Sequence, residues 1–129
     1  MIRIKIIDED DIIYARSEAR QFAEAEGFSL MEKTRLATAV SELARNIYRY
    51  ATSGQVEIEA INGEGKCGIV CRFIDQGPGI ENIEQVMEDG FSSGNSLGFG
   101  LPGAKRLSDH FSIKSVVGQG THIEIIKWK

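Results

Sequence analysis

Alternating hydrophobic and polar residues near both ends of the chain are typical of β-strands with one buried face. Isoleucine alternates with charged residues from Ile2 to Ile6, which predicts a strand there. Similar alternations or short apolar runs predict further strands over residues 56–60, 67–74, 111–117 and 122–128. The run over 67–74 is apolar on both faces apart from Arg72, so we expect this strand at the centre of a sheet.

Apolar residues at helical spacing predict helices between these strands. The first is expected over about residues 10–25, and Gly27 ends it. The second begins at the capping box of residues 29–32 and continues to about Tyr50. A short helix is expected over 82–88, and another from Leu101 to about 108–110 with His110 as its cap. Hairpins mixed with separate helices predict an α+β two-layer sandwich.

Composition and charge place the chain among ordinary globular proteins and exclude several partners. Its 129 residues predict one domain over 1–129, with 42% hydrophobic and 26% charged residues. A formal net charge of −4 argues against nucleic acid as the main partner. No apolar run approaches the ~20 residues of a membrane span, and the amino terminus is unlike a signal peptide. The expected location is therefore the cytoplasm, with no membrane partner.

The two cysteines are expected to be thiols. Cys67 and Cys71 are four positions apart in a predicted strand, so their Cα atoms would be roughly 13 Å apart. A disulfide requires less than about 7 Å. We therefore expect two buried thiols in a reducing compartment.

Two glycine clusters frame a loop-like segment in the second half of the chain. The first is Asp75-Gln-Gly-Pro-Gly79, at the end of the apolar strand, and the second is Gly98-Phe-Gly-Leu-Pro-Gly103. Glycine allows a backbone to approach a ligand closely, and the N–H groups of a helix start attract anions. The pair of clusters therefore predicts a site for a nucleotide and its phosphates.

The second cluster matches the pattern G-x-G-x-x-G, which several nucleotide-binding folds share. A dinucleotide fold also needs a strand directly before it and an acidic residue about 20 positions later, where this chain has Gly118. A eukaryotic-type protein kinase needs the H-R-D and D-F-G motifs, and a phosphate loop needs G-x-x-x-x-G-K-[ST]; the sequence has none of these. Context therefore excludes these three families.

Glu42 and Asn46 share one face of the second predicted helix because they are four positions apart. Glu42 could take a proton from an attacking hydroxyl, and Asn46 could offer an amide oxygen to Mg²⁺. Asp75 could accept a hydrogen bond from the amino group of adenine. Arg45, Lys105 and Arg106 could meet phosphate, although solvated surface charge explains them equally well.

Four motifs in order resemble the N box and glycine boxes of the GHKL ATPases. They are residues 41–46, 75–79, 98–103 and 118–121. Residues 86–91 and 103–108 resemble the bacterial anti-sigma-factor serine kinases within that superfamily, and residues 42–48 and 126–128 resemble the stressosome switch kinases. The resemblance implies a Bergerat fold, with a mixed, mainly antiparallel sheet, helices on one face, and a lid at about 81–97.

The resemblance also implies a serine/threonine kinase that uses ATP and Mg²⁺. Glu42 would be the catalytic base, Asn46 the Mg²⁺ ligand, and Asp75 the adenine contact, with Thr121 reaching adenine through water. Five glycines would bring backbone close to the nucleotide: Gly77, Gly79, Gly98, Gly100 and Gly103.

The expected partners are STAS-domain substrate proteins and a PPM-type serine phosphatase that is activated by binding. Arg45 stands before Asn46, where sporulation-type anti-sigma factors usually have a small residue. This difference favours a switch kinase. The alternative is a nucleotide-gated anti-sigma factor that binds a sigma factor directly.

Overall fold

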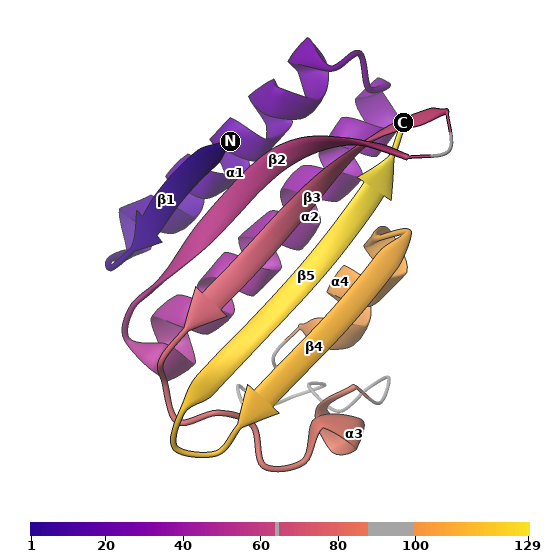
Figure 1. The fold of residues 1–129 in the computed structure, drawn as a ribbon. Helices are drawn as coiled ribbons and strands as arrows, with labels where there is room; N and C mark the ends of the chain where they lie inside the picture. Colours follow the sequence, from indigo (N-terminus) through magenta and orange to yellow (C-terminus); the bar gives the residue numbers. More distant parts are fainter. Residues whose placement is uncertain (64, 88–99) are drawn as a thin grey trace.

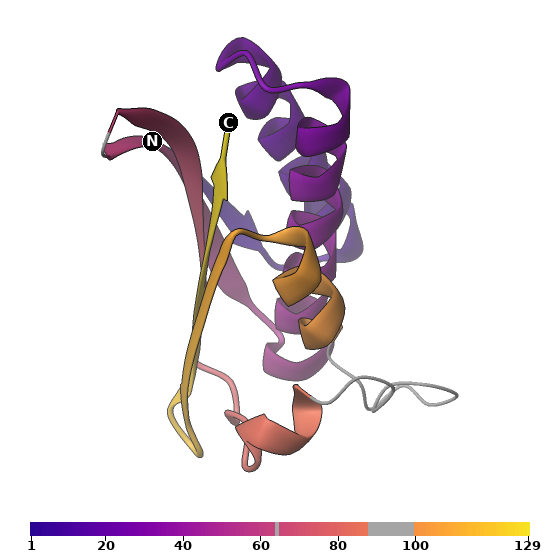
Figure 2. The same ribbon diagram turned by 90° about the vertical axis from the view of Figure 1, so that its right-hand side faces the viewer.

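A five-stranded sheet and a layer of helices on one of its faces form the protein (Figures 1 and 2). The computed structural model describes residues 1–63, 65–87 and 100–129. The predicted α+β sandwich is confirmed. Most of the predicted lid at 81–97, and Gly98 after it, lie outside the described residues.

The sheet has the spatial order β1-β2-β3-β5-β4, and each of its four pairings is antiparallel. Its strands are β1 (Ile2–Ile6), β2 (Gly54–Gly63), β3 (Lys66–Asp75), β4 (His110–Val116) and β5 (Gly120–Trp128). The position of β3 in the middle confirms the prediction made from its apolar sequence. Both neighbours of β3 are strands, so its backbone hydrogen-bonding groups are paired along both edges.

The helices are α1 (Glu9–Ala25), α2 (Leu30–Asn46), α3 (Ile83–Val86) and α4 (Leu101–Leu107), with a π-helical turn η1 (Ile47–Ala51) after α2. The Oγ of Ser29 accepts a hydrogen bond of 3.1 Å from the backbone N–H of Glu32, which confirms the predicted start of α2. The predicted extension to Tyr50 is helical but changes to π geometry after Asn46. Thr52 then ends the turn with a φ of 72°.

Helix α2 lies in the middle of the helical layer, packed between α1 and α4 (Figure 1). Leu36, Val40, Leu43 and Ile47 are almost completely buried, as their spacing predicts. They join buried residues of β2, β3 and β5 in a single core. Because α2 is anchored over the centre of the sheet, polar residues beside its apolar stripe lie next to the ends of β3 and β5.

One predicted boundary is wrong. Helix α4 ends at Leu107, and His110 is the first residue of β4 instead of a helix cap. Ser108 is already extended, and the backbone N–H of Asp109 donates to the carbonyl of Ile126 at 2.9 Å. Pairing with β5 therefore begins earlier than the helical pattern indicated.

The two cysteines differ in environment. Cys71 is buried, as predicted, but Cys67 is exposed, which corrects the prediction that both are buried. Cys67 lies beside the β2–β3 hairpin, which bends away from the helical layer in Figure 2. Burial raises the pKa of the Cys71 thiol to about 12, so this group stays protonated below that pH.

We expect a thiol reagent at about pH 8 to label Cys67 alone in the folded protein, because the thiolate is the reactive form. Denaturation should expose the second thiol to the reagent. Mass spectrometry of the labelled protein checks both results. Rapid double labelling under native conditions would contradict the burial of Cys71.

No helix among the described residues is long and apolar enough to span a membrane.

Two glycines with positive φ differ in how closely other atoms pack around them. Gly79 lies in the loop after β3, and Gly118 lies in the β4–β5 turn. A Cβ on Gly79 (φ 78°) would lie 2.5 Å from the carbonyl oxygen of Val116, whereas a Cβ on Gly118 (φ 81°) would meet nothing within 4 Å. We expect Gly118→Ala to cost about 1–2 kcal/mol, the penalty of a left-handed backbone. Gly79→Ala should cost roughly 1–3 kcal/mol more because of the clash.

Denaturant unfolding of both variants measures this difference. Equal losses of stability would contradict the close packing of Gly79 against β4.

Candidate functional site

The carboxylate of Asp75 joins three segments at one end of the sheet. Its Oδ1 accepts hydrogen bonds from the backbone N–H groups of Gly77, at 2.9 Å, and Thr121, at 3.2 Å. Asp75 also pairs with Thr121 in the register of β3 and β5. The first glycine cluster is therefore tied to the start of β5 through one side chain.

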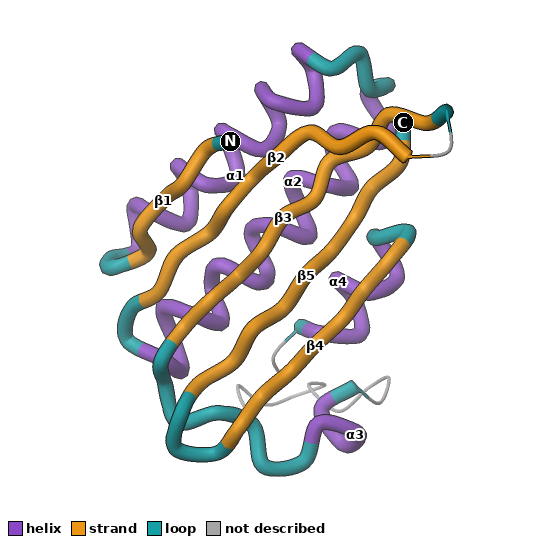
Figure 3. The backbone as a smooth tube through the Cα atoms, in the orientation of Figure 1, coloured by secondary structure: helices purple, strands orange, loops and turns teal. Residues whose placement is uncertain are grey.

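The loop after β3 and the β4–β5 turn lie side by side at this end (Figure 3). The backbone N–H of Gly118 donates to the carbonyl of Pro78 at 2.8 Å, which joins the two loops. A Cβ on Gly77 would lie 2.6 Å from the Cβ of Ala51, so η1 presses against the same loop. Gly77 is thus required by packing within the chain, independently of any ligand.

A pocket that is partly open to solvent lies between α2, η1 and this end of the sheet. Asn46, Asp75 and Thr121 contribute polar side chains to its wall, and Tyr50 adds a phenol. The rest of the wall is mainly apolar, from Leu43, Ile47, Ala51, Phe73, Pro78, Gly79, Ile80 and Ile123. Apolar walls with a few polar groups suit a flat heterocycle with hydrogen-bonding edges.

Ser115 supports the pocket, and the sequence prediction missed it. Its Oγ accepts a hydrogen bond of 2.7 Å from the N–H of Ile80 and lies 2.8 Å from the Oγ1 of Thr121. In the register of β4 and β5, Ser115 is paired with Thr121. A serine opposite a threonine, both at core-facing positions, is the signal that could have revealed it.

Glu42 lies in a second hollow, between α2 and α4, that is open to solvent. Its Oε1 is 3.3 Å from a guanidinium nitrogen of Arg45, and both side chains are partly exposed. A Cβ on Gly100 would lie 2.6 Å from its Oε2. Both carboxylate oxygens therefore have a close neighbour, and the positive φ of Gly100 favours glycine beside the second one.

The structure thus divides the predicted site residues between two hollows along α2. Asn46 lies with Asp75, Gly79 and Thr121, whereas Glu42 lies with Gly100 and Gly103. Gly100 precedes α4 with a φ of 65°, and among the described residues a Cβ on Gly103 would meet only the Arg106 guanidinium, at 4.0 Å. Within this described part of the chain, Gly103 therefore has more room than Gly77, Gly79 and Gly100.

Comparison with known proteins assigns the family. The profile of the histidine kinase-like ATPase domain matches residues 8–127. The chain is 52% identical over 125 residues to the serine/threonine-protein kinase RsbT of Bacillus subtilis (strain 168), covering 97% of this chain and 94% of that protein. The chain belongs to the histidine kinase-like ATPase family.

More distant relatives carry a different name. An anti-sigma F factor of Clostridium beijerinckii is 37% identical over 97 residues, which cover 70% of this chain and 66% of the relative. One from Thermoanaerobacter sp. (strain X514) is 30% identical over 121 residues, covering 89% and 83%. The family profile and the match to RsbT confirm the predicted family and the predicted enzyme class, an ATP-dependent protein kinase.

The pocket of this histidine kinase-like ATPase domain combines apolar walls with a carboxylate. Its walls are apolar, and Asp75 lies at its polar end, where a carboxylate can accept a hydrogen bond from an exocyclic amino group. Guanine presents a carbonyl oxygen at the corresponding position, which a carboxylate would repel. A carboxylate in this pocket therefore discriminates between bases that offer an amino group and bases that offer a carbonyl oxygen.

The described residues suit a metal that is held mainly by nucleotide and water. They contain no group of three or more His, Cys, Asp or Glu side chains placed to hold a metal ion. Mg²⁺ keeps several waters and binds one or two protein groups together with substrate phosphates. A single amide oxygen such as that of Asn46 is consistent with this mode.

Asp75→Asn tests the role of the carboxylate. An asparagine oxygen can still accept from Gly77 and Thr121, so we expect the fold to persist. Loss of a hydrogen bond to a charged group, about 1.5–3 kcal/mol, should weaken ATP binding by roughly 10–100-fold. Calorimetric titration gives the affinity, and thermal unfolding gives the stability. Unchanged ATP affinity would contradict an adenine contact at Asp75.

Proposed function

We propose that the protein is a serine/threonine kinase of a bacterial stress-signalling partner switch. It transfers the γ-phosphate of ATP to serine or threonine hydroxyls of STAS-domain proteins. One observation carries this proposal: Glu42 lies beside Gly100 and Gly103, at the start of α4, on the same helix as Asn46 in the Asp75 pocket. A carboxylate and a nucleotide pocket are thus held on one rigid element.

Glu42 acts as the general base in this proposal. The acceptor oxygen forms a bond to the γ-phosphorus as the bond from that phosphorus to the departing ADP oxygen breaks, and the hydroxyl proton moves to the Glu42 carboxylate. The guanidinium of Arg45 lies 3.3 Å from Oε1 and limits the rotation of the carboxylate. Oε2 lies next to Gly100, in the turn that is proposed to bind phosphate.

The remaining assignments concern binding. Asn46 would hold Mg²⁺, which neutralises charge on the phosphates when bound, and Asp75 and Thr121 would bind adenine, Thr121 through water. Gly100 and Gly103 lie where α4 begins, so their backbone can approach phosphate. Gly98 is assigned the same role from its sequence position alone. Gly77 and Gly79 shape the loop that follows Asp75.

The proposed setting is a single ATP-binding domain in the cytoplasm, with a lid at about 81–97, that also activates a PPM-type serine phosphatase by binding it. The 52% identity to the kinase RsbT supports this setting. Arg45 supports it as well. The position before Asn46 holds this large charged side chain, which forms an ion pair with Glu42.

A second function is favoured by the relatives named anti-sigma F factors. In that case the protein would be a nucleotide-gated module that binds a sigma factor directly. Its partner binding would respond to ATP against ADP and would not need the Glu42 carboxylate. The same variant therefore distinguishes the two functions.

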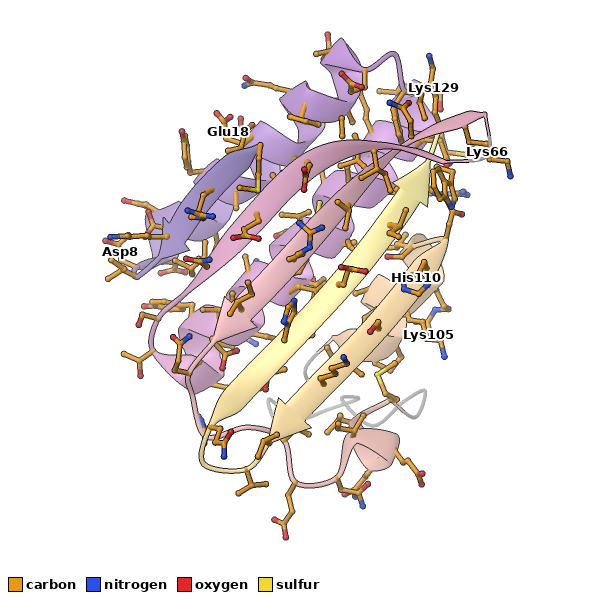
Figure 4. The ribbon with its side chains drawn as sticks, viewed as in Figure 1. Asp8, Glu18, Lys66, Lys105, His110 and Lys129 are labelled. Atoms are coloured by element: carbon orange, nitrogen blue, oxygen red, sulfur yellow. The ribbon has the colours of Figure 1, made fainter. Side chains whose placement is uncertain are left out.

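Glu42→Gln should lower phosphate transfer by about 10²–10⁴-fold, the contribution of a positioned base. ATP affinity should remain within about twofold, because glutamine keeps the size of the side chain and the Asp75 pocket is unchanged. The assay uses labelled ATP, Mg²⁺ and candidate STAS-domain proteins, and scores phosphoserine and phosphothreonine. Glu18→Gln on α1, whose side chain is labelled in Figure 4, is the matched control.

Two outcomes would contradict the proposal. Transfer that survives Glu42→Gln at the rate of the control would remove Glu42 from the chemistry. Failure of every STAS-domain protein to be phosphorylated, combined with nucleotide-dependent capture of a sigma factor, would favour the second function.

A further inference from the structure

A polar hollow, here called the Lys5 hollow, lies on the sheet beside the segment that joins η1 to β2. Lys5, Gln55 and Ile74 line it and are paired in register across β1, β2 and β3, so their side chains lie on one face. The alternate positions Ile4 and Val56 are buried beneath the helices. The Lys5 hollow is therefore on the opposite face of the sheet, which the helical layer in Figure 2 leaves uncovered.

The lining of the Lys5 hollow supplies hydrogen-bond donors and one positive charge. Its polar side chains are those of Lys5, Thr52, Ser53, Gln55 and Gln76. None of the described residues that line it is acidic. An ammonium group, two hydroxyls and two amides can all donate, whereas a carboxylate only accepts. The lining is therefore complementary to a carboxylate.

The carboxylate that shares this face of β2 already has partners. Oε2 of Glu57 lies 3.1 Å from Nε of Arg3 and accepts a hydrogen bond of 3.1 Å from the amide of Gln55. A guanidinium nitrogen of Arg72 lies 3.9 Å from its Oε1. Lys5, in contrast, has no ion-pair partner within the described part of the chain. The positive charge of the hollow is therefore not neutralised from within the protein.

The acidic start of α1 is the other negative group near the hollow. Oδ2 of Asp11 accepts hydrogen bonds from the backbone N–H groups of Ile7, at 2.9 Å, and Asp8, at 3.1 Å. Asp8 lies at the corner beside the end of β1 (Figure 4), and neither carboxylate lines the hollow. This cluster would repel a long run of acidic residues, so we expect a single carboxylate as the occupant.

Thr52 connects the Lys5 hollow to the Asp75 pocket. With a φ of 72°, it is the one non-glycine residue of positive φ in the described ranges. A β-branched residue rarely adopts this backbone, and such strain is concentrated at binding and switch segments. Thr52 directly follows η1, and π-helical turns are frequent at functional sites.

The two sites share their walls. Ala51 lines the Asp75 pocket, and the next residue, Thr52, lines the hollow. At the end of β3 the same division recurs, because Asp75 lines the pocket and Gln76 lines the hollow. A shift of either segment therefore changes both sites at once.

We propose that the Lys5 hollow binds a carboxylate side chain of a partner protein and that this binding is coupled to nucleotide in the Asp75 pocket. The carboxylate site stands independently of the proposed kinase function, whereas the coupling rests on the ATP site of that function. Coupling of this kind is reciprocal, so ATP changes the affinity for the partner by the same factor as the partner changes the affinity for ATP. The hollow thus gives a partner a way to sense the nucleotide without touching it.

Two small probes test the carboxylate site. One is glutamic acid capped as N-acetyl and N-methylamide, and the other is the identically capped glutamine, which has the same shape without the charge. NMR spectra of the ¹⁵N-labelled protein follow the backbone amides during each titration. The acidic probe should shift the signals of residues 5, 52–55 and 76, and the neutral probe should leave them in place.

Lys5→Gln should weaken binding of the acidic probe by about tenfold, because it removes a charge-assisted hydrogen bond. The matched control is Lys114→Gln, the same change on β4, outside the hollow. Neither lysine belongs to the residues assigned to ATP.

Calorimetric titration of ATP with Mg²⁺ then tests the coupling. At a concentration that saturates the NMR shifts, the acidic probe should change the Kd of ATP by about fivefold, the lower end of usual coupling. Thr52→Gly relieves the strain of the positive φ and should reduce this factor.

The outcomes separate the site, the coupling and the kinase function. Equal shifts with both probes, or equal affinities of Lys5→Gln and Lys114→Gln for the acidic probe, would overturn the carboxylate site. Specific binding of the acidic probe with an unchanged Kd of ATP would overturn the coupling. Absence of ATP binding to the unmodified protein would overturn the proposed nucleotide site and the coupling with it, while the NMR shifts would still decide the carboxylate site.

Discussion

The two hydrogen bonds accepted by Asp75 are the constraint on which the site depends. They fix the loop of Gly77 to the start of β5, and Thr121 is linked in turn to Ser115 on β4. Strands β3, β5 and β4 are therefore joined at one point, near the end of α2. A carboxylate used in this way both shapes the pocket and presents negative charge to whatever enters it.

Helix α2 fixes where the polar side chains of the site lie. Its apolar stripe is buried over the centre of the sheet, so its polar face has a fixed direction. Asn46 then lies in the pocket and Glu42 in the hollow between α2 and α4, one turn apart. Rigid helical spacing of this kind is well suited to chemistry that depends on positioning, because the two groups cannot move independently.

Most of the fold could be predicted from the sequence because its strands and helices have strong periodicity. The position of β3 followed from its apolar residues, and the start of α2 from Ser29. The π-helical η1, the exposure of Cys67 and the strand position of His110 could not be predicted, since tertiary packing decides them. Glycine patterns indicated a nucleotide site, but they gave no sign that Gly77 packs on Ala51 or that Gly100 lies against Glu42. The ion pair of Arg45 and the role of Ser115 also depend on contacts that only the folded chain creates.

The proposed ATP site lies between the end of α2 and the loop that follows Asp75. Calorimetric titration of ATP into the protein, with and without Mg²⁺, tests it most directly when Asn46→Ala is compared with the unmodified chain. The proposed site predicts uptake of one ATP per chain, with a gain from Mg²⁺ that Asn46→Ala abolishes. No uptake of ATP in the presence of Mg²⁺, or a gain that is the same in both proteins, would contradict it.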